Sequence, residues 1–289
     1  MPTASAADAA LVPVPVRLAA AASLGVPARA TRLPGMLAEL PPGTLVNVGY
    51  VASETDAERV VAARTICGAG LVPVPHVSAR RLPSRAALAA YLDALGRDGT
   101  GTRLFVVGGD PPEPAGPFVD AAEILASDEL ARADPASVSI GGHPEGHPVI
   151  AAGELWAALA HKARLIRRSG RDGEIISQLT LDAPAALAWL AEVRERGIDL
   201  PIRIGVPGPM AARPLLRYAD QVDARRTAAR LRGRDSAAIV TADDFLAEFA
   251  NGFDVRVHGE VGLHVFALSG PREAVRWMRG IAASESGLA

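Results

Sequence analysis

The chain has 289 residues, of which 49% are hydrophobic and 21% are charged. The 30 Lys and Arg side chains nearly balance the 32 Asp and Glu side chains, so the formal net charge is −2. This composition excludes an intrinsically disordered chain and a protein that binds nucleic acid mainly through positive charge. No run of about 18 apolar residues is present, so we expect no membrane-spanning helix. The single cysteine, Cys67, excludes an internal disulfide and a cysteine-rich zinc site.

The length suits one large domain, because α/β barrels typically have about 250 residues. Residues 1–22, rich in Ala, Pro and Val, are predicted to form a partly flexible N-terminal arm, and residues 23–289 a β/α barrel. Residues 1–8 lack the positive charge that precedes the apolar part of a secretory signal. We therefore expect a cytoplasmic enzyme. The sequence leaves its oligomeric state open, a homo-oligomer included.

Short β-branched runs alternate with amphipathic stretches along the chain, which is typical of repeated β-α units. Strands are expected, in chain order, at residues 23–26, 45–51, 71–77, 103–108, 137–141, 174–181, 201–206 and 262–268. Helices are expected over residues 55–67, 84–95, 120–131, 154–168, 184–196, 211–219, 241–250 and 272–282, with Thr55 and Ser84 as N-caps. The Arg-rich segment 224–235 is the least regular and is predicted to be a mobile loop.

Eight parallel strands with intervening helices close into a single (β/α)8 barrel of the TIM type. An open, doubly wound sheet is the competing architecture. No strand is followed by the G-x-G-x-x-G phosphate loop that nucleotide-binding versions of that sheet carry, so the barrel is favoured.

Polar residues stand where several predicted strands end, which in a β/α barrel is where reactive groups gather. These residues are His76, Asp110, Gln178 and the group His143, Glu145 and His147. The first three also have purely structural interpretations. His76 suits a core histidine bonded to a backbone carbonyl, Asp110 a turn residue, and Gln178 an amide paired with a neighbouring strand.

His143 and His147 have the spacing of two metal ligands on a helix. The prolines and the glycine around Glu145 prevent that helix, so we predict no metal site. Cys67 falls in a predicted helix with no histidine nearby in the sequence, and it is expected to pack rather than to react.

Six short motifs follow one another in an order typical of one enzyme family. They are VGYV (48–51), PHVS (75–78), GGDPP (108–112), HPEGHP (143–148), SQLTLD (177–182) and IGVPGP (204–209). With this series the chain resembles the methylenetetrahydrofolate reductase family, as a divergent, short bacterial type. The resemblance covers residues 45–219, and residues 262–268 resemble the family's last strand.

This resemblance implies a flavoprotein oxidoreductase of one-carbon metabolism. It would interconvert 5,10-methylene- and 5-methyltetrahydrofolate, with FAD relaying hydride from NAD(P)H. The implied partner is a small folate substrate. Asp110 and Gln178 would bind the pterin, and Tyr218 would pack against folate or nicotinamide, although without the resemblance Tyr218 suits a helix-face core residue equally well. Flavin contacts are implied for Tyr50, His76, Gly109, Asp110, His143 and His147, and phosphate contacts for Lys162 and Arg164.

The chain departs from the family pattern at four positions. The family's first-strand glutamate, its general acid, has no counterpart, and the nearest segment places Gly25 there. A threonine, an arginine and a tyrosine of the family are replaced by Gly49, Gly108 and His143. Asp110 and Glu145 are the remaining candidates for a catalytic acid or base.

Two alternatives therefore stand beside the flavoenzyme. One is a flavin-free enzyme in which NAD(P)H reduces the folate directly. The other is a non-catalytic folate-binding barrel. The arginines at 213 and 225–234 suit either the polyglutamate tail of a folate or a solvated face.

Overall fold

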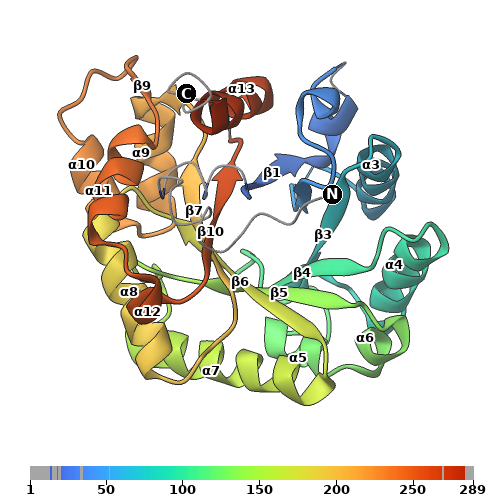
Figure 1. Ribbon diagram of the computed structural model, residues 1–289. Coiled ribbons are helices and arrows are strands. Elements are labelled where there is room, and N and C mark those ends of the chain that lie inside the picture. The colour runs from blue at the N-terminus through green and yellow to red at the C-terminus, as the bar shows by residue number, and fades with distance from the viewer. Residues whose placement is uncertain are drawn as a thin grey trace, which may run out of the picture.

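Eight parallel strands follow one another around a closed barrel (Figure 1). They are β1 (Ser23–Pro27), β2 (Leu45–Gly49), β3 (Val72–Ser78), β4 (Arg103–Val107), β5 (Ser137–Gly142), β6 (Asp172–Leu179), β7 (Ile202–Pro207) and β10 (Val261–Phe266). The computed structural model describes residues 14, 18, 21–32, 35–51, 53–268 and 270–283. Closure between β1 and both β2 and β10 confirms the (β/α)8 prediction and excludes the open sheet.

Helices surround the barrel on its outside (Figure 1). The longer ones are α3 (Asp56–Gly68), α4 (Arg85–Arg97), α7 (Ala152–Ser169), α8 (Ala183–Glu195), α9 (Ala212–Gln221), α11 (Asp243–Gly252) and α13 (Pro271–Ala283). The shorter ones are α5 (Ala121–Leu125), α6 (Asp128–Ala133), α10 (Arg225–Leu231), α12 (Val255–His258) and the 3-10 turns η1 (Ala28–Arg32), η2 (Leu37–Glu39) and η3 (Ala79–Arg81). A small antiparallel pair, β8 (Met210–Ala211) and β9 (Ile239–Val240), lies outside the barrel sheet.

Local sequence determines where the main helices begin. Thr55 accepts a hydrogen bond from the Glu58 amide at 3.2 Å, and the Glu58 carboxylate accepts one from the Thr55 amide at 2.9 Å, which together form a capping box at α3. Ser84 caps α4 through the Ala87 amide in the same way. Both predicted N-caps are therefore confirmed.

Alternation along the strands separates an apolar outer layer from an unusually polar lumen. Outward residues such as Leu24, Val46 and Val48 are buried in the largest apolar cluster, against the helices. Val74, Phe105 and Ile176 form a separate small cluster, because they come from three different strands and point into the barrel. Polar inward residues sit beside them, among them Asn47, His76 and His264. Branched aliphatic side chains usually fill this space in such barrels.

Three expectations about local structure are wrong. The helix predicted over 120–131 is split into α5 and α6, because the Ser127 hydroxyl donates to the Ile124 carbonyl and accepts from the Leu130 amide, ending one helix and capping the next. Within the Arg-rich segment 224–235, residues 225–231 form helix α10 instead of a loop. Cys67 is exposed on α3, so it does not pack in the core.

The predicted arm, residues 1–22, lies mostly outside the described residues, and the division at residue 23 stays a prediction. Barrel strand β1 begins at Ser23. In the part of the chain that the structure describes, no helix has the length and apolar character needed to cross a membrane.

Candidate functional site

Two of the three predicted substrate-binding residues, Gln178 and Tyr218, are in contact at the mouth of the barrel, and the third, Asp110, lies near enough for its charge to act on Tyr218. Asp110 follows β4, Gln178 lies near the end of β6, and Tyr218 comes from α9. The Tyr218 hydroxyl donates to Gln178 Oε1 at 3.2 Å. Burial raises the pKa of Tyr218 to about 12, and the nearby Asp110 carboxylate acts in the same direction, so this hydroxyl keeps its proton at neutral pH.

The side chain of Gln178 is aimed by an irregularity in β6. The pairing of β6 with β7 shifts register between Ile176 and Leu179, as in a β-bulge. Gly205 on β7 makes this possible, since a Cβ there would lie 2.5 Å from the Ser177 carbonyl oxygen. Gln178 Oε1 accepts from the Leu179 amide at 2.9 Å as well as from Tyr218. Because Oε1 already accepts two hydrogen bonds, the amide NH2 is the group that Gln178 can offer to a ligand.

Asp110 is held loosely at the mouth. Its side chain is 85% exposed, and its carboxylate makes a 3.4 Å ion pair with Arg81. The preceding Gly109 has φ +98°, and a Cβ there would lie 2.3 Å from the Ser78 hydroxyl. Gly109 therefore sets the direction in which the chain presents Asp110, and this role is independent of any cofactor contact.

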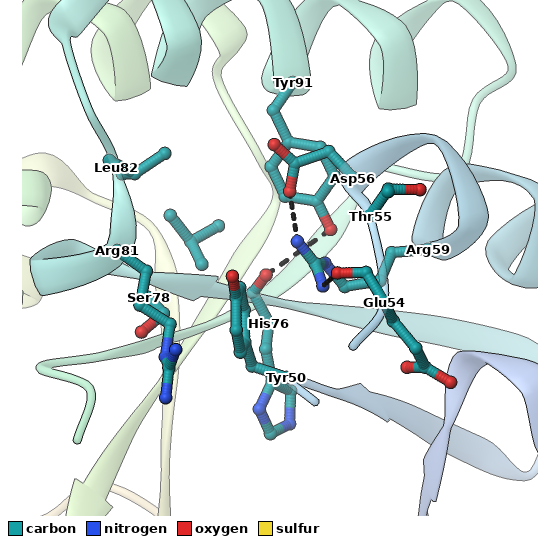
Figure 2. A pocket seen from close by; sticks show the side chains of 11 residues that line it. Tyr50, Glu54, Thr55, Asp56, Arg59, His76, Ser78, Arg81, Leu82 and Tyr91 are labelled. Carbon is teal, nitrogen blue, oxygen red and sulfur yellow. Dashed lines mark hydrogen bonds and ion pairs between the residues drawn. The ribbon is translucent and has the colours of Figure 1, made fainter. Parts of the chain in front are cut away.

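A cavity of about 280 Å³ lies between the β2–α3 and β3–α4 connections, beside the mouth (Figure 2). The ring of Tyr50 stands between two guanidinium groups there. The Cζ atom of Arg59 lies 4.2 Å from the ring centroid, and that of Arg81 lies 4.4 Å from it. Because both groups lie over this ring, Tyr50 is engaged within the protein, whereas the resemblance implies a flavin contact for it.

His76 points into the lumen at the bottom of this region. Its ring meets Phe105 edge-on at 4.6 Å between centroids. Burial, and secondarily the charge of Arg59, lower the pKa of His76 to about 3, so the imidazole is neutral at physiological pH. His76 Nε2 and both side-chain polar atoms of Asn47 lack hydrogen-bond partners within the described parts of the chain. For His76, the interpretation as a satisfied core histidine therefore does not account for Nε2.

His143 and His147 lie edge-on to each other, with ring centroids 5.3 Å apart. Burial lowers the pKa of His143 to about 3, and the charges of Lys162 and His147 act in the same direction. His147 Nδ1 accepts a hydrogen bond from the Val149 amide at 3.3 Å. Among the residues that the structure describes, no group of three or more His, Cys, Asp or Glu side chains has the geometry of a metal site.

Glu145 differs from Asp110 because its carboxylate is fully engaged. It accepts hydrogen bonds from the hydroxyls of Thr180 and Thr227, both at 2.6 Å, and from the amides of Arg226 at 2.7 Å and Thr227 at 3.0 Å. These bonds join the segments that follow β5, β6 and α9. A catalytic role for Glu145 stays a prediction, and the geometry favours a positioning role.

The two basic residues expected at the FAD phosphates do not converge. Lys162 Nζ donates to the Gly141 carbonyl at 3.1 Å, and burial lowers the pKa of Lys162 to about 8. Arg164 is exposed and lies about 200° further around α7, on the opposite side of the helix. The pair therefore does not form a shared phosphate cradle.

Sequence reasoning missed two residues that belong to this region, Arg81 and His264. A Cβ on Gly25 would lie 2.7 Å from His264 Nε2, so an imidazole from β10 fills the space beside Gly25, the position that the resemblance aligns with a glutamate. His264 Nδ1 lies 2.9 Å from the Ser23 hydroxyl. A histidine inside the apolar run of residues 261–266 was a usable signal for His264, whereas Arg81 resembles any other surface arginine in the sequence.

No family model matches the chain. Its fold is similar to that of the dihydropteroate synthase FolP from Thermus thermophilus, with a TM-score of 0.45 and 14% sequence identity. The match covers 92% of this chain and 93% of that one. At this level of similarity, neither finding identifies a ligand or a reaction for this chain.

Proposed function

We propose that this chain is an oxidoreductase that interconverts 5,10-methylene- and 5-methyltetrahydrofolate with NAD(P)H. The ordered motifs in residues 45–219 suggest this reaction. The observation that carries it is the hydrogen bond between Gln178 and Tyr218, 40 residues apart in the sequence, at the barrel mouth, with the charge of Asp110 near enough to act on Tyr218. The mouth of a β/α barrel is where such enzymes hold their substrates.

The three residues complement a pterin. The ring is flat, and its edge carries N–H donors beside a carbonyl acceptor. The exposed Asp110 carboxylate can accept two such N–H groups, and the free NH2 of Gln178 can donate to the carbonyl. The Tyr218 ring supplies an aromatic face, and its hydroxyl fixes the orientation of the Gln178 amide.

FAD is the relay that the resemblance implies, and the residues present do not form a complete seat for it. Gly49 and Gly108 lack the side chains that would contact the flavin or its phosphates. Tyr50 lies between two guanidinium groups, and Lys162 and Arg164 diverge. These observations favour the flavin-free form of the enzyme, in which the nicotinamide reduces the folate directly.

In this direct scheme the hydride leaves the reduced nicotinamide and joins the methylene carbon. The bond from that carbon to N10 breaks, and N10 takes a proton. N10 takes this proton from solvent, which reaches the exposed mouth, while the Asp110 carboxylate holds the pterin edge. The engaged carboxylate of Glu145 is less suited to exchange a proton with a ligand.

The test is the visible absorption spectrum of freshly purified protein, followed by NADH and NADPH oxidation with 5,10-methylenetetrahydrofolate, with and without added FAD. Colourless protein that turns over without FAD is the result we expect. A yellow protein, or activity only with FAD, would instead establish the flavin-dependent form. Folate binding with no hydride transfer in either direction would contradict the proposed reaction and leave a binding barrel.

A further inference from the structure

A buried arginine, Arg59, forms part of the wall of the cavity beside Tyr50. Arg59 is 2% exposed, and its guanidinium bonds to the Asp56 carboxylate and, at 3.2 Å, to the Glu54 carbonyl. These contacts and the Tyr50 ring hold the side chain in one place (Figure 2). Arg59 therefore packs against the Tyr50 ring, and the ring in turn packs against Arg81.

The Arg81 side chain is held in place but makes few hydrogen bonds. Its guanidinium stacks on Tyr50, and its ion pair with the exposed Asp110 is long, at 3.4 Å. The adjacent Arg80 behaves differently. Its guanidinium donates to the carbonyl of Pro111 at 2.6 Å, to that of Val119 at 3.1 Å and to that of Pro112, so it clamps the loop after β4. Arg81 is left with donors that a ligand can use.

The acidic groups around the cavity compensate Arg59 but leave the charge of Arg81 available to a ligand. Asp56 is paired with the buried Arg59. The Glu54 carboxylate accepts from the amides of Ala28 at 2.9 Å and Arg29 at 2.8 Å, so it is turned toward β1 and η1 (Figure 2). Asp110 is the remaining partner of Arg81, and its exposure allows it to leave.

Buried hydrogen-bonding groups at the same cavity lack partners. Ser78 and Arg59 line it, and neither the Ser78 hydroxyl nor the Nε atom of Arg59 has a hydrogen-bond partner among the described residues. Ser78 is buried, and a buried hydroxyl without a hydrogen-bond partner is unfavourable. An oriented guanidinium beside unpaired polar donors is the arrangement that binds an anion such as phosphate.

We infer that this cavity receives the diphosphate of a dinucleotide, with Arg81 as the residue that contacts it and Tyr50 and Arg59 as positioning residues. The inference rests on the proposed function, which requires such a ligand next to the folate. The cavity of about 280 Å³ is smaller than most whole-ligand pockets, so it suits the diphosphate while the rest of the dinucleotide lies across the mouth. When Arg81 takes the phosphate it gives up Asp110, which is then free to bind the pterin.

NADH, NADPH and FAD share this diphosphate, and direct titration of each, together with ADP-ribose, distinguishes the source. In Arg81→Gln, we expect the Kd of the ligand that binds to rise by about tenfold or more. The Kd of Arg81→Lys should lie between those of Arg81→Gln and the unaltered protein, because lysine keeps the charge but lacks the planar guanidinium. The control is Arg97→Gln, which removes an exposed arginine at the far end of α4. Asp110→Asn removes the competitor of the phosphate and should leave this Kd unchanged or lower it.

Equal dinucleotide affinity in Arg81→Gln, Arg97→Gln and the unaltered protein would overturn the inference. So would the absence of binding by all four probes. Arg81-dependent binding without folate turnover would support the diphosphate site and contradict the proposed function. Turnover with NADH that is unchanged in Arg81→Gln would support the proposed function and contradict the diphosphate site.

Discussion

Two carboxylates at the ends of neighbouring strands, both candidates for catalysis in the sequence, occupy opposite environments. Around Glu145 the protein supplies four hydrogen bonds from two hydroxyls and two amides. Around Asp110 it supplies a 3.4 Å ion pair and leaves the side chain 85% exposed. A carboxylate whose acceptor positions are occupied by the protein stabilises the loops that it joins, whereas one left open at a barrel mouth is available to a ligand.

The largest expected effect is on turnover at the open carboxylate. Asp110→Asn keeps the shape of the side chain but removes the charge and one of the two oxygens that accept the pterin N–H groups. We expect kcat/KM for the folate to fall by about a hundredfold or more, while the free energy of unfolding changes by less than about 0.5 kcal/mol. Steady-state kinetics and urea unfolding measure the two quantities. A large loss of stability with normal turnover per folded molecule would show that Asp110 stabilises the fold and does not act on the folate.

The second effect is on stability at the engaged carboxylate. Glu145→Gln replaces charge-assisted acceptors with an amide that cannot accept from four donors, so we expect a loss of about 2 kcal/mol in the free energy of unfolding. The urea midpoint should fall with an unchanged slope. Turnover measured below the transition should fall much less than in Asp110→Asn. A hundredfold loss of turnover without destabilisation would make Glu145 the catalytic acid or base.

A third effect concerns the polar lumen below both carboxylates. The pKa of His264, which is 1% exposed, is lowered by burial to about 3 from an ordinary value of 6.5. Between these values the unfolded chain binds a proton that the folded chain does not, so stability falls as the pH falls below about 6.5. We expect a loss of roughly 1 kcal/mol per pH unit from this residue. His76 and His143 act in the same direction.

Urea unfolding of His264→Gln at several pH values isolates this contribution. The variant is compared by the slope of stability against pH rather than by absolute stability, because the substitution also alters packing against Gly25. A slope unchanged from that of the parent protein would show that His264 is accessible to protons in the folded state. The lumen around His264 would then be open to solvent, as the region around Asp110 is.

The sequence was sufficient for the barrel because strand periodicity and N-caps are local signals. The capping box at Thr55 and the end of β4 next to Asp110 follow from a few adjacent residues. Helix α10 was missed because its support is tertiary, with Arg230 pairing with Asp182 and Glu248 from other parts of the chain. For the same reason the sequence could not separate Glu145 from Asp110, since the donors to Glu145 at Thr180 and Thr227 are 35 and 82 residues away.

The smallest effect tests whether the open region is organised as the structure has it. Tyr218→Phe keeps the aromatic face and removes the hydroxyl that donates to Gln178 Oε1. One neutral hydrogen bond contributes about 1 kcal/mol, so we expect the KM for folate to rise several-fold while kcat stays near that of the parent protein. Tyr218→Leu, which removes the ring as well, should raise KM further. If Phe and Leu are equivalent, the ring does not face the folate, and Tyr218 belongs to the apolar cluster that packs behind it.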